Sequence, residues 1–510
     1  MERKHSVHGA GVRRARGAAP GPAVGRGLAA ALACASAALV SAGACRDPGR
    51  TAPELPLRVT PDSVTVAWGD TVRLAAEGSG PVRWSSADTT VARVDAGGVV
   101  TPVRAGAARI EARADARAGH ATVVVVARFA EVAAGADASC GVVPAGRVLC
   151  WGAPLDTATA RAFWGERYTH AVTSPRPAPP TERALAIRLL RLPTLAADPV
   201  WSYACAIVAA GGARCWGAAE YGQQGVGVVG QGTQLPPTAL GGPAPLVDVA
   251  LGYRHACGLA AGGVAHCWGL GALGHAQRNA TCPYGGSRGT ACQTVPAPVA
   301  TALRFASIAP GGVHTCAVSL DGRLHCWGTG WAAGHPGGPF HEYATPTAID
   351  TATYATVTAG QAHACATTPA GELRCWGEND RGQLGRVVAD SAAHARPTAV
   401  DPVEGAGAPL RVRGASAGTG FTCAVATDAR VHCWGDNRWG QLGDGTTASR
   451  ARPAPVRSVR RFVAVSAGTT HACAVAEDGA TFCWGDNRRG QLGNGTTASS
   501  SLPVRVGAPR

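Results

Sequence analysis

The feature that most constrains this chain is a pair of cysteines, separated by nine residues, that recurs seven times. The pairs are Cys140 with Cys150, Cys205 with Cys215, Cys257 with Cys267, Cys316 with Cys326, Cys365 with Cys375, Cys423 with Cys433, and Cys473 with Cys483. The second cysteine of each pair begins a Cys-Trp-Gly phrase. Successive phrases lie about 50 to 65 residues apart, which leaves room for four short strands in each repeat. The repeat therefore predicts the blades of a β-propeller rather than a helical solenoid.

The spacing inside each pair predicts a disulfide across a hairpin. An odd number of intervening residues centres on a three-residue loop, and this loop type favours a left-handed glycine at its last position. Glycine stands one residue past the midpoint of six pairs, and Ala429 takes that place in the seventh. The two cysteines then lie directly opposite each other, within the Cα separation that a disulfide requires.

Zinc is the alternative use of these cysteines, because histidines lie close to several of them in the sequence. His255 precedes Cys257 by two residues, and His266 stands immediately before Cys267. A structural zinc site needs four ligands with short spacing, whereas these pairs lie in different blades. We therefore favour disulfides and expect no metal and no cofactor.

The amino-acid sequence of the repeat also resembles that of a known family. The phrase from Trp484 to Gly493 reads WGDNRRGQLG, and the segments that begin at Trp376 and Trp434 repeat it closely. These phrases resemble the repeats of the regulator of chromosome condensation family, closely in the last three blades and loosely in the first four. The resemblance implies a seven-bladed β-propeller over residues 128–510. The chain ends in a Pro-Val strand that the start of the domain lacks, so we expect the two ends to complete one blade between them.

The segment before the propeller predicts a small β-sandwich. Residues 45–54 form a polar linker, and residues 55–127 contain short alternating strands separated by Gly, Pro and Asp turns. The WSSAD phrase that begins at Trp84 and the GVVT phrase that begins at Gly98 resemble the bacterial Ig-like domain of group 2. That resemblance implies a spacer or adhesion module, with Trp84 in its core. The whole fold is thus expected to be all-β, an Ig-like sandwich followed by a propeller.

The first 44 residues read as an export signal. Residues 1–26 are basic, and a small apolar run leads from Gly27 to Ala44 and ends at Cys45. The residues before Cys45 resemble a bacterial lipobox, with Ala42 where the family usually has leucine. This implies lipidation of Cys45, and the alternative is ordinary signal-peptide cleavage nearby. Both alternatives predict a secreted or cell-surface location, outside the cytoplasm, where disulfides persist.

Two insertions offer candidate binding residues. Cys282 and Cys292 share the spacing of the repeat pairs but no Cys-Trp-Gly follows, so we expect a disulfide that closes an inserted loop bearing Tyr284 and Arg288. A second insertion, residues 153–183, carries Trp164, Arg167 and Tyr168. Tyrosine, tryptophan and arginine contribute most of the binding energy at many interfaces. The insertion closed by Cys282 and Cys292 could equally serve only to resist proteases. Trp331, Trp439 and Tyr253 are further candidates, because we expect these aromatic side chains to be exposed.

The remaining composition favours a binding protein over an enzyme. The formal net charge is +14, but part of it lies in the leader and the other arginines are mostly scattered singly, so no nucleic-acid stripe is visible. No nucleophile elbow, phosphate loop or metalloprotease helix occurs. We expect a non-catalytic scaffold that binds a protein partner, with the membrane contacted only through the lipid anchor. A glycan-binding propeller is the alternative. The family resemblance also implies nucleotide exchange, but that activity requires a cytosolic or nuclear GTPase, which an exported chain would not meet.

Overall fold

The computed structural model describes residues 56–507, except 69, 79, 104, 153–171, 178–183, 190–202, 210, 231–232, 243–244, 283–289, 335–341 and 404–407. The leader, the linker and Cys45 lie outside the described residues. So do five candidate contact residues of the insertions: Trp164, Arg167, Tyr168, Tyr284 and Arg288. Within the described part of the chain, no helix has the length and apolar character needed to cross a bilayer.

Residues 58–126 form nine short strands, as the alternation of apolar and polar residues predicted. The strands are β1 (Arg58–Thr60), β2 (Ser63–Ala67), β3 (Val72–Arg73), β4 (Ala75–Glu77), β5 (Arg83–Ser86), β6 (Ala92–Val94), β7 (Val99–Pro102), β8 (Gly106–Ala114) and β9 (Arg117–Val126). They make a four-stranded sheet β2-β9-β8-β5, a three-stranded sheet β3-β7-β6 and the pair β1-β4. Alternate residues of β8 and β9 are buried, and Trp84 is half-buried against their core.

The rest of the described chain forms seven further sheets, the blades. Blade 1 is β10 (Glu131–Ala134), β11 (Ala138–Val142), β12 (Val148–Gly152) and β13 (Val172–Pro177); blade 2 is β14 (Ala184–Leu189), β15 (Tyr203–Val208), β16 (Ala213–Ala218) and β17 (Gln234–Ala239); blade 3 is β18 (Leu246–Leu251), β19 (His255–Ala260), β20 (Ala265–Gly269), β21 (Ala280–Cys282) and β22 (Thr290–Pro298); blade 4 is β23 (Phe305–Pro310), β24 (His314–Ser319), β25 (Arg323–Gly328) and β26 (Tyr343–Thr353), with the 3₁₀ turn η1 (Trp331–Ala333) between the last two. Blade 5 is β27 (Thr356–Ala359), β28 (His363–Thr367), β29 (Leu373–Asn379) and β30 (Asp390–Ala399); blade 6 is β31 (Val412–Ala417), β32 (Phe421–Ala426), β33 (Val431–Gly435) and β34 (Arg450–Pro455); blade 7 is β35 (Phe462–Ala467), β36 (His471–Ala476), β37 (Thr481–Gly485) and β38 (Ser500–Arg505).

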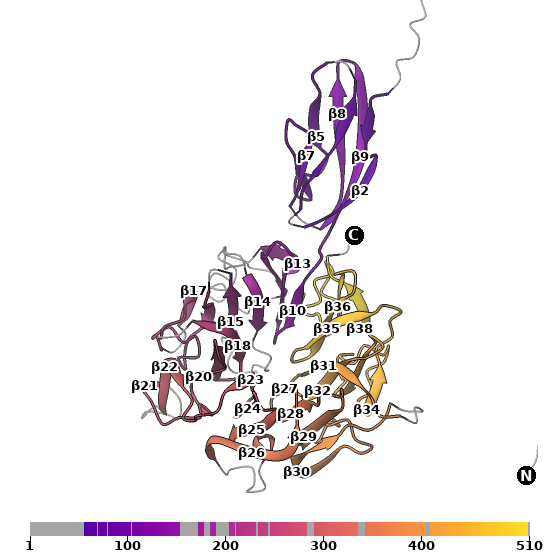
Figure 1. Cartoon of the computed structure of the whole chain (residues 1–510). Coiled ribbons are helices and arrows are strands. Elements are labelled where there is room, and N and C mark those ends of the chain that lie inside the picture. The colour runs from indigo at the N-terminus through magenta and orange to yellow at the C-terminus, as the bar shows by residue number, and fades with distance from the viewer. Residues whose placement is uncertain are drawn as a thin grey trace, which may run out of the picture. The chain divides into compact units, whose positions relative to one another are not determined.

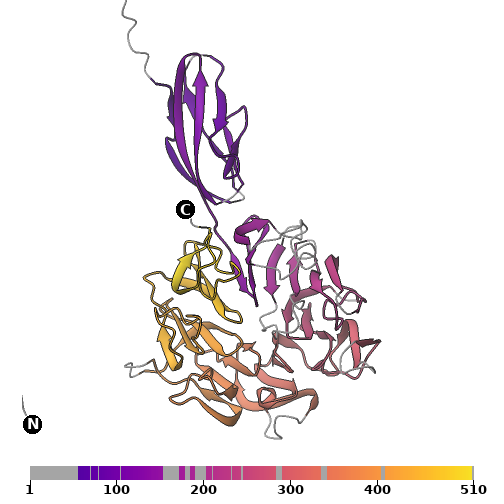
Figure 2. The same ribbon diagram turned by 180° about the vertical axis from the view of Figure 1, so that it is seen from behind.

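The blades follow one another around a ring (Figures 1 and 2). The first strand of every blade lines a central cavity of about 320 Å³, and the fourth strand lies at the outside, except in blade 3, where β21 lies outside β22. Hydroxyl groups join neighbouring inner strands: Ser416 Oγ accepts the amide of Ala467 at 3.0 Å, and Ser466 Oγ accepts that of Ala134 at 2.9 Å. The seven-bladed propeller predicted from the cysteine repeat is thus the observed fold.

The hairpins of the seven pairs have the predicted geometry. The glycine that ends each loop has a positive φ, for example 81° at Gly322, and Ala429 adopts the same conformation with φ 66°. The two cysteines of each pair are direct partners in the ladder, and each disulfide ties the second strand of a blade to the third.

All seven predicted cysteine pairs are joined in the structure. In blade order, the disulfides link Cys140 to Cys150, Cys205 to Cys215, Cys257 to Cys267, Cys316 to Cys326, Cys365 to Cys375, Cys423 to Cys433, and Cys473 to Cys483. Both sulfurs of every pair are buried. The cysteines of the repeat are therefore part of the frame, and none of them is free to hold a metal.

The eighth disulfide has a different place. Cys282 and Cys292 tie β21 to β22, and β21 is a fifth strand at the edge of blade 3. The two cysteines are not direct partners in the ladder, because Cys292 pairs with Ala280 and Cys282 with Thr290. Both sulfurs are buried beside Tyr221 and Leu270. The disulfide therefore anchors the base of the insertion on the neighbouring loops.

The expectation that the two chain ends complete one blade is wrong. All four strands of blade 1 and all four of blade 7 come from contiguous segments. The C-terminal Pro-Val strand is the fourth strand of its own blade, where Val504 pairs with Cys483. The ring closes instead by contacts between complete blades. The amide of Phe129 donates to Gly479 O at 2.9 Å, and the Trp151 indole donates to Gln491 O at 2.8 Å.

The hydrophobic core lies between blades rather than inside one. Neighbouring side chains of a strand point to opposite faces, so the cysteine and the tryptophan of each Cys-Trp-Gly phrase face different neighbours. Each interface cluster joins the disulfide of one blade to the tryptophan of the next, for example Cys205–Cys215 with Trp268. The same arrangement recurs at all seven interfaces, including Cys473–Cys483 with Trp151 at the closing one. All seven tryptophans are fully buried.

Candidate functional site

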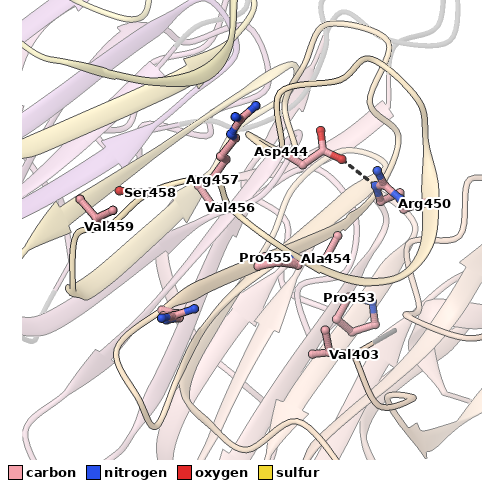
Figure 3. A pocket seen from close by; sticks show the side chains of 11 residues that line it. Val403, Asp444, Arg450, Pro453, Ala454, Pro455, Val456, Arg457, Ser458 and Val459 are labelled. Carbon is pink, nitrogen blue, oxygen red and sulfur yellow. Dashed lines mark hydrogen bonds and ion pairs between the residues drawn. The ribbon is translucent and has the colours of Figure 1, made fainter. Parts of the chain in front are cut away.

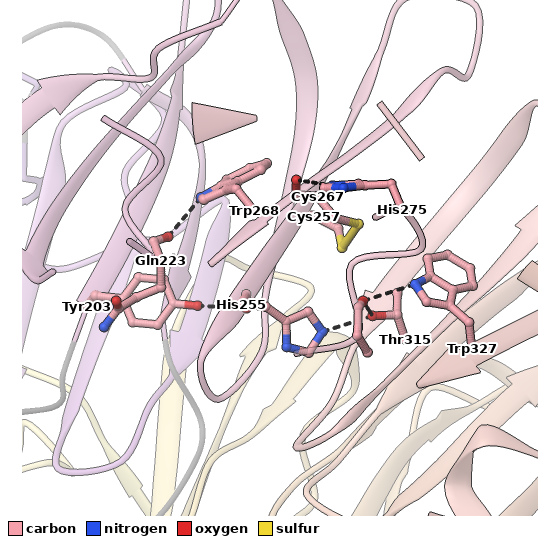
Figure 4. Close-up of a disulfide and its surroundings, with 10 residues drawn as sticks. Tyr203, Gln223, His255, Cys257, Cys267, Trp268, His275, Thr315 and Trp327 are labelled. Atoms are coloured by element: carbon pink, nitrogen blue, oxygen red, sulfur yellow. Dashed lines mark hydrogen bonds between the residues drawn. A yellow bond between two sulfur atoms is a disulfide. The ribbon is translucent and has the colours of Figure 1, made fainter. Parts of the chain in front are cut away.

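Histidine–hydroxyl pairs link blades at a belt beside the disulfides (Figure 4). The Thr315 hydroxyl donates to Ala272 O at 3.0 Å, and its oxygen lies 2.8 Å from Nε2 of His255 in the preceding blade. Because the hydroxyl proton is already used, His255 must donate through Nε2. Trp327 Nε1 donates to the same Ala272 carbonyl at 2.9 Å. One loop carbonyl therefore fastens two side chains of the next blade.

The same arrangement recurs at two more interfaces. His363 pairs with Thr422 at 2.9 Å, and His471 pairs with Ser139 at 2.7 Å across the closing interface. Other blades use different solutions at the histidine position. Tyr203 donates its hydroxyl to backbone carbonyls of blade 3, and blade 6 has the apolar Phe421. The belt is thus a structural device with interchangeable members.

These histidines are neutral because they are buried. Burial lowers the pKa of His255, His363 and His471 to about 4. For His314, burial and then the neighbouring His255 and His363 lower the pKa to about 3. A neutral imidazole can ligate a metal, but in the described residues no three His, Cys, Asp or Glu side chains gather in a way that could hold one.

The polar residues of the recurring WGDNRRGQLG phrase are used for internal contacts. Asn487 accepts the amide of Leu492 at 2.9 Å and donates to Thr496 O and Ala498 O at 3.0 and 2.9 Å. Gln491 Oε1 accepts the amide of Arg489 at 2.9 Å. The equivalent Asn437 and Gln441 make the same contacts in blade 6. The repeated polar residues therefore hold the loop and are not available to a ligand.

The two positions between the Asn and the Gly of the phrase differ from blade to blade, and they reach the surface. They are Asp380 and Arg381 in blade 5, Arg438 and Trp439 in blade 6, and Arg488 and Arg489 in blade 7. We call the five other than Asp380 the arginine rim: Arg381, Arg438, Trp439, Arg488 and Arg489. The guanidinium of Arg488 stacks 3.7 Å from the centre of the Trp439 ring, which joins blade 7 to blade 6. Arg381 donates to Asp436 of the next blade at 3.1 Å. The rim is therefore a continuous row of cationic and aromatic side chains on three neighbouring blades.

The acidic partners of the arginine rim lie beneath it. The Arg438 side chain is 67% exposed while that of Asp436 is 8% exposed, and Arg488 over Asp486 shows 61% and 5%. Burial alone would raise the pKa of each aspartate, but the hydrogen bonds and charge of its arginine hold that pKa below its ordinary value. Bonding to Asp436 raises the pKa of Arg438. At Arg438 and Arg488 the surface that meets solvent is thus positive, with the counter-charge buried. Arg381 also lies 3.6 Å from Asp380, whose side chain is 52% exposed.

The sequence-derived candidates divide as follows. Trp439 lies in the rim but is half-buried under Arg488, Tyr253 is half-buried with Arg254 4.7 Å from its ring centre, and Trp331 begins the turn η1 of blade 4. Of these three candidates, only Trp439 belongs to the rim, and the structure brings none of the three together. Sequence reasoning missed the arginines of the rim. Their signal was present: the two positions that vary inside an otherwise repeated phrase.

Comparison with known proteins agrees with this architecture. The model of the regulator of chromosome condensation (RCC1) repeat matches residues 370–425, 428–475 and 478–510, and a second model of that repeat matches 354–383, 412–441 and 462–491. The bacterial Ig-like domain (group 2) matches residues 56–125.

Among solved structures, yeast RCC1 (Prp20) bound to Kap60 is similar, with 18% identity, a TM-score of 0.58, and coverage of 74% of this chain and 85% of that chain. Prp20p from Saccharomyces cerevisiae, studied with its binding to Gsp1p and histones, has 18% identity, a TM-score of 0.56 and coverage of 74% and 87%. Human WBSCR16 has 19% identity, a TM-score of 0.56 and coverage of 72% and 92%. At these identities the likeness concerns the fold. The chain thus carries RCC1 repeats, folded into a seven-bladed β-propeller, behind a bacterial Ig-like domain of group 2.

Proposed function

We propose that the protein is a non-catalytic scaffold, exported or anchored at the bacterial cell surface, that binds a protein partner through the arginine rim and the adjoining propeller loops. The observation that carries this proposal is the division of labour within the repeat. The residues that recur hold the frame, and the residues that vary, apart from Asp380, form a row of arginines that reaches solvent and includes the half-buried Trp439. Arginine and tryptophan are the residue types enriched at the energetic centres of protein interfaces.

An extracytoplasmic location is supported by the cysteines. Eight disulfides join all sixteen cysteines of the described residues, and disulfides persist in oxidising compartments. A frame held at every blade also suits a binding surface outside the cell, because a preorganised surface loses little entropy on binding. The lipobox-like residues before Cys45 supply the proposed anchor.

The test is affinity capture of partners from an envelope extract of the source bacterium. The bait is the full chain, compared with an Arg438→Gln/Arg488→Gln variant, in which the amides can still donate to the buried aspartates. An Arg304→Gln/Arg505→Gln variant makes the same charge change on blades 4 and 7. We expect a protein captured by the wild type and the control but lost from the rim variant. Failure to enrich any protein, or equal capture by all three baits, contradicts the proposal.

A further inference from the structure

Blade 6 carries a groove on its outer side that the rim does not include (Figure 3). It has a volume of about 640 Å³ and lies along β34 and the segment from Val456 to Val459. We call it the blade 6 groove. Its lining side chains are Val403, Arg430, Asp444, Arg450, Pro453, Ala454, Pro455, Val456, Arg457, Ser458 and Val459. The lining combines an aliphatic wall with three arginines and one carboxylate.

Only part of the positive charge in the groove is compensated. Arg450 donates to Asp444 at 2.6 Å. Burial alone would raise the pKa of Asp444, but hydrogen bonds from Arg450 and Thr446 hold it below its ordinary value, so the pair stays ionised. Arg430 reaches Asp428 only at 3.9 Å, with both side chains largely exposed. The Arg457 guanidinium lines the groove and makes no ion pair with any residue that the structure describes.

The apolar part of the groove is open to solvent. Val459 is fully exposed and Pro455 is exposed, while Pro453 and Val456 form a buried floor beside them. Exposed aliphatic surface next to the guanidinium of Arg457 and the weakly paired guanidinium of Arg430 is complementary to a ligand that offers both an aliphatic side chain and carboxylates. Among the described residues, no aromatic ring lines the groove. A sugar ring usually packs its C–H face on an aromatic ring, so the lining favours a peptide over a glycan.

The backbone restricts how a peptide can bind there. The inward-facing amide of Val456 donates to Val431 O at 2.9 Å, so the alternate positions, Pro453 and Pro455, face outward without an N–H group. An added strand would find no donors at these two positions. Recognition must therefore come from side chains.

We infer that the blade 6 groove binds an acidic peptide segment of the partner, with an aliphatic side chain against the Pro-Val wall and carboxylates on Arg430 and Arg457. The inference rests on the proposed function, because the occupant is part of a protein. It adds the chemistry of that partner and a site separate from the arginine rim.

The test is binding of synthetic peptides to the full chain, followed by fluorescence anisotropy. The probe has a central leucine flanked by glutamates. Matched peptides replace the leucine by serine or the glutamates by glutamine. We expect saturable binding of the probe, at least about fivefold weaker binding of the serine peptide, and no measurable binding of the glutamine peptide. In an Arg430→Gln/Arg457→Gln variant the probe should bind about tenfold more weakly, and in Arg304→Gln/Arg505→Gln it should bind as in the wild type.

Four results overturn the inference. If Arg430→Gln/Arg457→Gln and Arg304→Gln/Arg505→Gln weaken binding of the probe equally, the probe is held by general charge attraction. Absence of saturable probe binding removes the site. Retention of polygalacturonate, lost from Arg430→Gln/Arg457→Gln, with no peptide binding, assigns the groove to a glycan. A protein partner that is captured equally by the wild type and by Arg430→Gln/Arg457→Gln also contradicts the inference, but it leaves the proposed function intact.

Discussion

At the scale of single residues, three of the four buried histidines at the equivalent blade position bond a hydroxyl group of the next blade, and His314 is the exception. Each buried histidine that has a hydroxyl partner finds it immediately before the first cysteine of the next blade, as with Thr315, Thr422 and Ser139. Phe421 and Tyr203 face Ala472 and Ala256 at that position. His314 breaks the rule, because the residue at that position of blade 5 is Ala364 and neither ring nitrogen of His314 has a hydrogen-bond partner among the described residues. A buried polar group without a partner destabilises a fold by about 1 to 3 kcal/mol.

The exception predicts a stabilising substitution. Ala364→Ser places a hydroxyl where Ser139 stands in blade 1, and we expect it to raise the free energy of unfolding by about 1 kcal/mol by accepting from His314 Nε2. The matched control is Ala472→Ser, which puts the same hydroxyl behind Phe421 and should not stabilise. Urea unfolding under oxidising conditions at pH 7.5 measures both. Equal effects of the two substitutions contradict the role assigned to His314.

At the scale of the strand, the fourth strand of every sheet of the propeller, which is the outer edge in all blades except blade 3, carries a proline. The fourth strand has one immediately before the residue that pairs with the second cysteine, at Pro175, Pro237, Pro296, Pro346, Pro397, Pro453 and Pro503. The paired residue directs its backbone groups inward, so the proline occupies a position whose N–H would point away from the blade. Pro296 and Pro453 are buried there, whereas Pro237, Pro346, Pro397 and Pro503 are half-buried. The recurring proline removes that donor from the outer side of the strand and hinders pairing with another chain.

The edge prolines predict a change in self-association. A variant with Pro397→Thr, Pro453→Thr and Pro503→Thr restores three outward N–H groups on neighbouring blades. We expect it to form oligomers at concentrations where the wild type is monodisperse, as measured by light scattering after gel filtration. The same three positions changed to lysine restore the donors but add edge charge, and that control should remain monodisperse. Monodisperse threonine and lysine variants alike would rule out a protective role for the prolines.

The sequence predicted the blades, hairpins and cysteine pairs because these depend on local spacing. It did not predict the proline rule, since the register that gives each proline its direction is a property of paired strands. It also predicted the wrong closure of the ring, because nothing in the repeat marks whether the Pro-Val strand is the last strand of one blade or the first strand of the next. The arginine rim could not be predicted from the sequence, because the contact between Arg488 of blade 7 and Trp439 of blade 6 exists only when the loops are folded.

At the scale of the whole molecule, the ring depends on its interfaces and therefore on the charge of the belt. The depressed pKa values of His255, His314, His363 and His471 mean that these groups stay neutral when folded but ionise when unfolded. The unfolded chain then binds more protons at acid pH. Stability is unaffected above about pH 6.5, the ordinary pKa of histidine, and falls as the pH drops toward about 4.

This linkage predicts acid sensitivity that a single substitution reduces. Each of the four histidines should lower the free energy of unfolding by about 2 kcal/mol on going from pH 7.5 to pH 5. His314→Phe copies the Phe421–Ala472 arrangement of blade 6, so we expect it to reduce the loss of free energy of unfolding between pH 7.5 and pH 5 by the contribution of one histidine. Urea midpoints at the two pH values, followed by tryptophan fluorescence, measure the difference. A variant as sensitive to acid as the wild type would show that His314 does not carry this linkage.

We propose that the recurring residues form a frame of disulfides and buried tryptophans, which leaves the exposed arginines for a partner outside the cytoplasm. Peptide mapping of the full chain without reduction shows whether the frame exists. The account predicts eight disulfides, each joining cysteines ten positions apart, as in Cys257–Cys267 and Cys282–Cys292. Free thiols at the blade cysteines, or links between different blades, would contradict it.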